Sequence, residues 1–533
     1  MRSRRRHLGR LSLLAAIGTP LAVLSVGSPA LAASSQPPAV KPQAGPHASS
    51  KTTGSGDFVH GVLPPPPPGS TTTYNIAAEP QIRSDPAGNF YISSENGVGA
   101  GTDAWKSTDN GLAYSALAQP NAVSTAGASS TSGVAPGGGD TDLATAPVKN
   151  ASTSNAQYNV YVASLTAANV TISASINGGL TWQKNVLSAT MPGDDREWIA
   201  AYGPSTYYLS YHNLSTGDQI IVNQGTLVNG VPTTVQTYSA INPAQTTIYA
   251  GTYLDNEVGN LAVDQRTGDV YQVFAGCPPQ ATSLATCPDL NTVYMAVGTP
   301  TGAGTTGLPV LSFTDYIVYR SPTPAVTLSN NFTNVAVDSA GNVYAAWSND
   351  HGVFVSYSTD HGQTWSAPMQ VSSGTATTAI YPWMTAGAPG KVDIVYYGTP
   401  ASANFQTCAQ HTAKYTCQDE PWYVFFSQDL KVLSGGKWTQ EQVTPVVHYG
   451  GVCQGGVSCT ATGNDNRDLY DDFGVSASPT TGLASITYSD DQYADNVGTA
   501  NAGECTSTQN NTVSCDHTDF ATQTAGFPIY TVK

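Results

Sequence analysis

The sequence has few charged residues and almost no long apolar stretches. Charged side chains make up only 11% of the 533 residues, and no segment of the main body shows the 3.6-residue apolar periodicity of an amphipathic helix. Glycine, serine, threonine and alanine are plentiful, which favours short strands and turns. The one long apolar run, residues 11–26, is too short for a membrane anchor. We therefore expect a soluble β-rich protein without membrane insertion.

The N-terminal segment has the features of an export signal. Five arginines precede the apolar run, and Ala30-Leu31-Ala32 follows it as a small-residue cleavage site. We assign residues 1–32 to a signal peptide, with general or twin-arginine export both open. Residues 33–73 are rich in alanine, serine and proline and end near a five-proline run, which predicts a disordered leader. The folded domain is then expected at 74–533, in a secreted protein.

Positive charge is scarce. The chain has 20 lysines and arginines, and removing the five signal-peptide arginines leaves 15 basic residues against 36 acidic ones, a net charge of −21. This balance makes nucleic acid an unlikely partner, because binding it depends on neutralising phosphates. The mature chain keeps five arginines, namely Arg83, Arg196, Arg266, Arg320 and Arg467.

Cysteine is absent from the first half of the chain. All eight cysteines follow residue 270 and fall into four close couples. In an exported protein this pattern predicts local disulfides, and no C-x-x-C spacing supports the alternative of metal binding. The expected pairs are Cys277–Cys287, Cys408–Cys417, Cys453–Cys459 and Cys505–Cys515.

A short turn motif recurs along the chain. Residues 358–365 read S-T-D-H-G-Q-T-W, residues 175–182 read S-I-N-G-G-L-T-W, and residues 107–114 read S-T-D-N-G-L-A-Y. A decayed fourth copy begins at Ser427-Gln428-Asp429 and ends at Trp438. Serine and aspartate side chains can close such a turn on backbone N–H groups. This motif resembles the Asp-box (BNR) repeat of the sialidase-like β-propellers, and the resemblance covers residues 74–533. It implies a structural turn between the third and fourth strands of a blade.

A second repeat points to the same architecture. An apolar segment, a turn and an alternating aromatic strand recur near residues 82–91, 142–163, 198–211, 261–271, 335–344, 383–397 and 473–488. We interpret these as the first two strands of seven four-stranded antiparallel blades, an all-β propeller. Six blades are the alternative, because the sialidases that the chain resembles have six and the second unit is weak.

Blade geometry sorts the loops between two faces. The loops before inner strands and those between second and third strands share one face, opposite the repeated turns. All four cysteine couples fall in loops of this class, which are also the longest ones, at 398–421, 446–472 and 489–521. Because function most often lies on elaborated loops over a rigid scaffold, we expect the site on this face.

Acidic residues gather on the same face. They can act as general acid and base in glycoside cleavage, hold Ca²⁺, or form a solvated rim, and the residues leave these alternatives open. The segment 464–468 only loosely suggests a calcium loop, with Asp465 and Asp468 as charged ligands, and no other cofactor is expected. The acids are Asp140, Asp142, Asp194, Asp195, Glu197, Asp255, Glu257, Asp465, Asp468, Asp471, Asp472, Asp490, Asp491 and Asp495.

The family resemblance implies a set of catalytic roles. Enzymatic sialidases clamp a substrate carboxylate with three arginines, use a tyrosine activated by a glutamate as nucleophile, and use an aspartate as acid/base. The roles map onto Arg83, Arg196 and Arg467 for the clamp, Tyr470 with Glu197 or Glu257 for the nucleophile, and Asp142 or Asp140 for the acid/base. The chain departs from the family at its F/Y-R-I-P opening, where Arg83 follows Ile82. The alternative for Arg196 and Arg467 is ion pairing with the neighbouring Glu197 and Asp471.

Together these features predict a secreted, monomeric, sialidase-like propeller that binds or cleaves an extracellular glycan or glycoconjugate. The alternative is a non-catalytic propeller that binds another protein. If the arginines converge in one pocket, the enzyme of exo-α-sialidase type is favoured. If they are scattered, a binding module is favoured.

Overall fold

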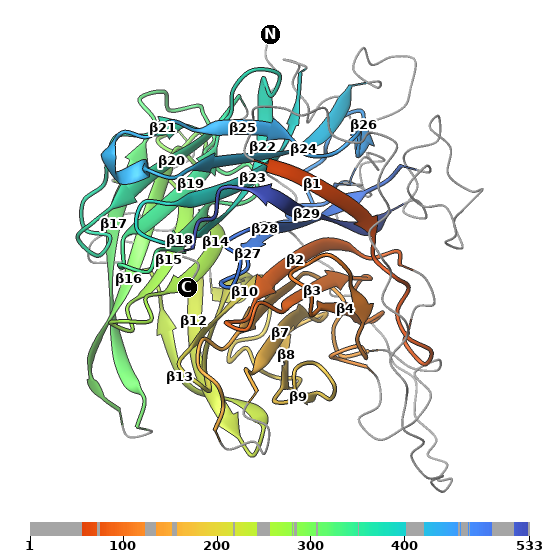
Figure 1. Cartoon of the computed structure of the whole chain (residues 1–533). Coiled ribbons are helices and arrows are strands. Elements are labelled where there is room, and N and C mark those ends of the chain that lie inside the picture. The colour runs from red at the N-terminus through yellow and green to blue at the C-terminus, as the bar shows by residue number, and fades with distance from the viewer. Residues whose placement is uncertain are drawn as a thin grey trace, which may run out of the picture.

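The computed structural model describes residues 56–71, 75–122, 135–151, 157–216, 219–241, 256–279, 281, 285–304, 307–349, 351–400, 420–456, 459, 467, 469–492 and 516–530. These residues form seven antiparallel sheets arranged in a ring, a seven-bladed β-propeller (Figure 1). All seven predicted units are present as the first two strands of successive blades, which decides the count in favour of seven. Within the described residues no helix is long and apolar enough to cross a membrane.

The strands follow the chain blade by blade, from the hub outward. Blade one has β2 (Ala78–Ser84), β3 (Phe90–Glu95), β4 (Thr102–Ser107) and β5 (Ser115–Ala116). Blade two has β6 (Thr141–Thr145), β7 (Val160–Leu165), β8 (Val170–Ser175) and β9 (Gln183–Asn185). Blade three has β10 (Asp194–Tyr202), β11 (Thr206–Asn213), β12 (Gln219–Val228) and β13 (Val231–Ser239), with a 3₁₀ turn, η1 (Leu214–Thr216), between its second and third strands.

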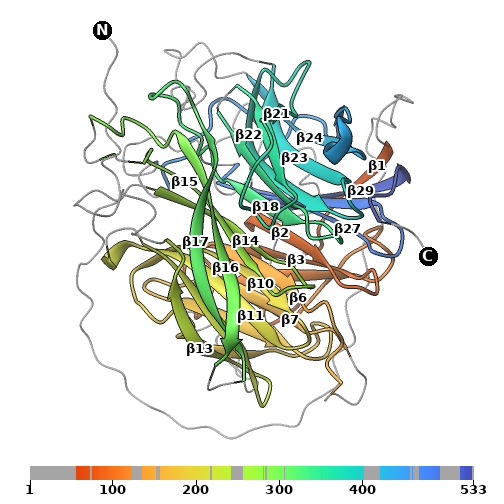
Figure 2. The same cartoon turned by 90° about the vertical axis from the view of Figure 1, so that its left-hand side faces the viewer.

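Blade four has β14 (Asn256–Val263), β15 (Val270–Gly276), β16 (Thr292–Ala303) and β17 (Pro309–Arg320), and its long outer hairpin is clear in Figure 2. Blade five has β18 (Asn334–Val337), β19 (Val343–Ser348), β20 (Val353–Ser358) and β21 (Met369–Gln370). Blade six has β22 (Thr378–Ala386), β23 (Val392–Thr399), β24 (Pro421–Asp429) and β25 (Thr439–Gln442), and the short β26 (His448–Tyr449) pairs with β24. Blade seven has β27 (Gly474–Ala477), β28 (Ala484–Asp490) and β29 (His517–Gly526).

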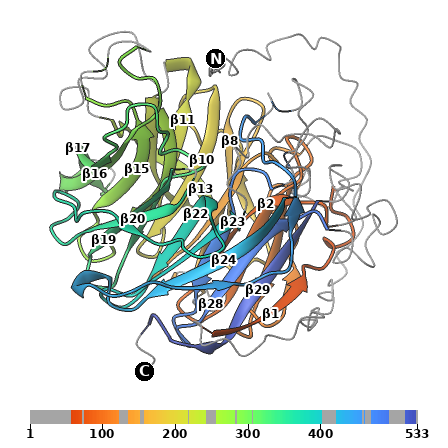
Figure 3. The same cartoon turned by 90° about the horizontal axis from the view of Figure 1, so that it is seen from above.

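The fourth strand of blade seven comes from the other end of the chain. The strand β1 (Gly56–Val62) pairs antiparallel with β29, so the sheet order is β1-β29-β28-β27 (Figures 1 and 3). This corrects the leader predicted at 33–73, because residues 56–62, which were assigned to it, form a strand of blade seven. The strand escapes sequence analysis because its seven residues sit beside a proline run and find their partner only when the ring closes.

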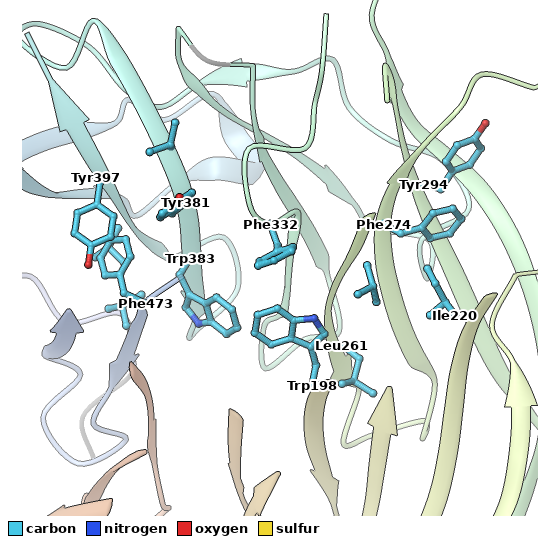
Figure 4. Close-up of a cluster of buried hydrophobic side chains, with 14 of the residues drawn as sticks. Trp198, Ile220, Leu261, Phe274, Tyr294, Phe332, Tyr381, Trp383, Tyr397 and Phe473 are labelled. Atoms are coloured by element: carbon cyan, nitrogen blue, oxygen red, sulfur yellow. The ribbon is translucent and has the colours of Figure 1, made fainter. Parts of the chain in front are cut away.

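Aromatic and aliphatic side chains fill the space between neighbouring blades. Second strands contribute fully buried tyrosines such as Tyr161, Tyr271 and Tyr344, and the small inner-strand residues let the blades approach the crowded hub. The largest cluster of buried apolar side chains spans several blades. Figure 4 shows part of this cluster, where Trp198 and Trp383 face each other below Phe332.

The repeated turns join third strands to fourth strands, as predicted. At residues 358–365, Ser358 Oγ donates to Asp360 Oδ1 (2.7 Å), while the N–H groups of Gly362 and Thr364 donate to Ser358 Oγ and Asp360 Oδ1. The turns after β4 and β8 have the same connections. The decayed copy after β24 differs, since it runs through a 3₁₀ turn, η4 (Val432–Ser434). The motif therefore forms a structural turn, and it lies on the face of the propeller opposite the starts of the inner strands.

A second kind of turn joins the first strand of a blade to the second. Blades four and five differ in the polar contacts of this turn, and two substitutions can test the effect of the difference. In blade five, Asn342 Nδ2 donates to Asp338 Oδ2 (2.8 Å). In blade four the corresponding residue is Asp269, which cannot donate, and Asp264 Oδ2 accepts no hydrogen bond.

We expect Asn342→Asp to lower the free energy of unfolding by about 1–3 kcal/mol at pH 8, because it replaces a hydrogen bond by two like charges. Asp269→Asn should act in the opposite direction. Urea unfolding of both variants checks the pair, and destabilisation by both substitutions would contradict the explanation.

Candidate functional site

The candidate site lies where the inner strands begin, on the face that carries the disulfide-linked loops. Three inner strands have a bulge there, centred on Glu79 (φ 50°), Arg196 (φ 51°) and Tyr381 (φ 58°). Positive φ costs of order 1 kcal/mol for such residues and persists only where the surroundings enforce it. The bulges bring side chains of different blades together at the hub. We call the group Glu79, Asp140, Arg196, Arg467, Asp471 and Asp472 the hub cluster.

Arg196 is the centre of the hub cluster. Its side chain is 4% exposed and contacts four carboxylates at the starts of three blades. Its guanidinium lies 3.1 Å from Glu79, 3.5 Å from Asp140, 3.2 Å from Asp471 and 4.0 Å from Asp472. The ring of Phe332 covers it, with the ring centroid 4.3 Å from Cζ. One buried cation therefore balances acids from blades one, two and seven.

Arg467 joins the same acids from the loop before β27. It forms a bidentate pair with Asp471, with both N–O distances 2.7 Å, and its Nη2 lies 3.1 Å from Glu79 Oε1. Glu79 is fully buried and thus bridges Arg196 and Arg467. The two arginines converge as the resemblance implies, but a carboxylate of the protein already lies between them.

Arg83 has its own carboxylate partner and is linked to the hub cluster through Gln81, which accepts from Arg83 Nη1 (3.1 Å) and donates to Asp472 Oδ2 (2.8 Å). Its Nη2 donates to Asp142 Oδ1 (2.8 Å), and its guanidinium stacks on Trp383 with 4.9 Å to the ring centroid. Asp142 also accepts the N–H of Ile199 (2.9 Å). The contact thus ties blades one, two, three and six together. No contact between Arg83 and the two other arginines is recorded among the described residues.

The remaining predicted site residues do not form the expected tyrosine–glutamate couple, although Tyr470 lies against Arg467, with 5.5 Å from Arg467 Cζ to its ring centroid. Tyr470 donates its hydroxyl to Asp516 Oδ2 (2.9 Å). Glu197 is 1% exposed, and neither of its carboxyl oxygens has a hydrogen-bond partner. Burial first, and then the charge of Asp140, raises the pKa of Glu197 well above its usual value. Glu257 is likewise on an inner strand, β14.

The pKa values of neighbouring acidic residues in the hub cluster are shifted in opposite directions. Burial raises the pKa of Asp472 to about 7 against the opposing charge of Arg196, and burial also raises the pKa of Asp140. Burial acts the same way on Asp471, but the charge and hydrogen bonds of Arg467 outweigh it and lower the pKa of Asp471. Carboxyl groups whose pKa values are shifted in opposite directions therefore lie around the same guanidinium.

The cluster also has metal-ligand character. Oxygens of Glu79, Glu95 and Asp140 lie within 4.8 Å of one another. Because Arg196 and Arg467 already bind Glu79, guanidinium groups supply the positive charge there, and a Ca²⁺ ion would compete with them. The loosely predicted calcium ligands Asp465 and Asp468 lie outside the described residues, as do Asp255 and Asp495.

Sequence analysis missed two residues at the hub, Glu79 and Tyr381. Tyr381 is 1% exposed and lies beside Arg467 and Asp471, whose charges act on its hydroxyl. A signal was available, because Tyr381-Pro382 stands at the same place in its blade as Glu79-Pro80 does in blade one.

Two predicted disulfides border this face. Cys277–Cys287 follows β15, and Cys453–Cys459 precedes β27, with Cα–Cα distances of 5.3 and 6.1 Å. The other two couples, Cys408 with Cys417 and Cys505 with Cys515, lie outside the described residues.

No protein-family model matches the chain, and no curated protein matches it. Solved structures with a similar fold include a GH93 α-L-arabinofuranosidase of Fusarium graminearum (12% identity, TM-score 0.39, covering 64% of this chain and 92% of that one). They also include an Aleuria aurantia lectin (12%, 0.37, 70% and 97%) and the NanB sialidase of Streptococcus pneumoniae (9%, 0.36, 85% and 69%). At these identities the similarity concerns the propeller fold alone.

Proposed function

We propose that this protein is a secreted, sialidase-like propeller whose hub cluster binds an extracellular glycan and cleaves a glycosidic bond by acid–base chemistry. One observation carries the proposal. Asp140 and Asp471 flank the same guanidinium, that of Arg196, and have pKa values shifted in opposite directions. Glycoside cleavage needs one protonated and one ionised carboxyl group on the two sides of a scissile bond.

Exposure supports these roles. The side chains of Arg467, Asp140 and Asp471 are 20%, 17% and 10% exposed, whereas Glu79 is fully buried. Within the hub cluster these three groups are therefore the ones most accessible to a sugar. Asp140 would donate the proton to the leaving oxygen, and Asp471 would stabilise positive charge at the anomeric carbon or act on it as base or nucleophile.

The arginine partners favour a neutral sugar over an acidic one. Arg196 and Arg467 each bind at least two carboxylates of the protein, so the carboxylate of a sialic acid would have to displace Glu79 or Asp471. Breaking a buried ion pair in this way costs several kcal/mol. A neutral glycan meets no such competition. The export of the protein is supported by its disulfides.

The test is a panel of fluorogenic glycosides that includes arabinofuranosides, hexosides and a sialoside. We expect turnover of a neutral glycoside by the wild type and a loss of about 100-fold or more in Asp140→Asn, because general acid catalysis is removed. Asp57→Asn, on the exposed edge of β1, serves as the folded control with unchanged turnover.

Two other outcomes would replace the proposal. Binding on a glycan array without turnover would establish a non-catalytic glycan-binding propeller. Turnover of the sialoside that Arg196→Lys abolishes would establish the sialidase mechanism, since lysine lacks the bidentate fork. Failure to bind or cleave any sugar would leave the protein-binding alternative in its place.

A further inference from the structure

A second group of ionisable residues lies away from the hub cluster, in the blade that closes the ring. Asp490 ends β28 and His517 begins β29, and the two residues are directly paired across the strands. Asp519 lies two residues further along β29, and therefore on the same face of the sheet as His517. That face packs against blade six, because Ala521, two residues beyond Asp519, belongs to the same buried cluster as Val424 and Phe426.

These three side chains are buried and close together. Asp490 is 1% exposed, His517 is fully buried and Asp519 is 4% exposed. Each offers one ligand atom, and the three atoms lie within 4.8 Å of one another. A divalent ion at bond lengths of about 2.0–2.2 Å requires its ligand atoms to lie no more than about 4.4 Å apart. Side-chain adjustments of a few tenths of an ångström would bring all three atoms within this limit.

The contact between His517 and Asp519 is long for a hydrogen bond but has a suitable length for two ligands of a shared ion. His517 Nε2 and Asp519 Oδ1 are 3.5 Å apart. Asp519 Oδ1 is buried and accepts no hydrogen bond. Two ligands at tetrahedral angles on a zinc ion are separated by about 3.4 Å. Asp519 Oδ1 is therefore placed to coordinate an ion bound between the side chains of His517 and Asp519.

The charge of these three side chains also favours binding of a cation. Two carboxyl groups are buried beside a single imidazole, and His517 is the one ionic partner recorded for Asp519 in the described part of the chain. A bound divalent ion would supply the missing positive charge.

We propose that Asp490, His517 and Asp519 form a structural site for one divalent transition-metal ion of the zinc class. Mixed imidazole and carboxylate ligands select zinc or manganese over calcium, which takes oxygen ligands. The ion would join β28 to β29 within blade seven and so strengthen the closure of the ring. The site goes beyond the proposed glycan function and is independent of it.

The first experiment measures metal content in the secreted protein, purified without chelators from zinc-supplemented medium. Elemental analysis is expected to find about one ion per chain in the wild type. Asp519→Asn should reduce occupancy at least tenfold. The matched control is His448→Asn, which breaks another buried His–Asp pair, to Asp491 (2.7 Å), outside the three-residue group; it should keep the ion.

The second experiment needs no variant and therefore does not depend on whether Asp519→Asn folds. The wild type is unfolded, stripped with a chelator and refolded with or without ZnCl₂. We expect the melting temperature to be higher with zinc, since an ion that binds only the folded state stabilises it, and cobalt in its place should give visible absorption bands. A wild type that contains no metal and melts at the same temperature with and without zinc would overturn the proposal. Retention of the ion by Asp519→Asn would also overturn it.

Discussion

Replacing Arg196 by methionine is expected to lower the free energy of unfolding by about 3–5 kcal/mol at pH 8, because removing one partner of a buried ionic network leaves uncompensated charge. Arg196 is the cation closest to Asp140 and Asp472 among the described residues, and it shares Glu79 and Asp471 with Arg467. Methionine preserves much of the apolar stem but removes the guanidinium that lies under Phe332, so this cation–π contact is lost together with the ion pairs.

The loss should depend on pH in a defined direction. Burial already raises the folded-state pKa of Asp472 to about 7, above its unfolded value of 3.8. Between these two values the folded state binds more protons than the unfolded state, so stability falls as pH rises. Without Arg196 the hub carboxyls bind protons more strongly still, and the slope should steepen. The deficit of the variant should therefore be largest near pH 8 and smallest near pH 4.

Urea unfolding at pH 4.5 and pH 8 measures this dependence. The matched control is Arg320→Met, because Arg320 is exposed at the end of β17. A deficit in Arg196→Met below about 1 kcal/mol at pH 8, the range of an exposed ion pair, would show that the hub acids do not depend on this cation.

Deleting residues 56–62 is expected to abolish cooperative folding of the propeller. The strand β1 pairs with β29 over its whole length, from Gly56 opposite Gly526 to Val62 opposite Asp519. Phe58 also packs edge-on against Phe426 of blade six, with 5.3 Å between ring centroids. Without β1, the edge of β29 and the apolar side of blade six would both be exposed to water.

The control is a chain that starts at Gly56 and lacks only the preceding residues. It should melt in one transition, like the full chain, whereas the chain that starts at Leu63 should aggregate or melt without cooperativity. Size-exclusion chromatography and thermal unfolding distinguish the two. A single, unshifted transition in the shorter chain would show that ring closure does not need β1.

Local sequence patterns were sufficient to predict the structure where it depends on contacts between residues close together in the chain. The turn at 358–365 closes on side chains within seven residues, so its position between third and fourth strands could be predicted from S-x-D-x-G-x-T-W alone. The same holds for the two short-range disulfides, Cys277–Cys287 and Cys453–Cys459. The seven strand–turn–strand units are local in the same sense, and they determined the blade number.

Contacts between residues distant in sequence determined the features that local sequence patterns did not predict. Glu79 lies 117 residues from Arg196 and 388 from Arg467, yet it binds both, because the ring brings the starts of blades one, three and seven to one hub. Sequence alone identified both arginines but not the carboxylate between them. Similarly, β1 became a strand only through β29, and Asp490, His517 and Asp519 came together only through the register of the last blade. The sequence by itself thus determined the repeating blade, since its turns and strands depend on local hydrogen bonds and alternation. Only closure of the ring decided which charges meet, since those contacts join blades that the chain visits hundreds of residues apart.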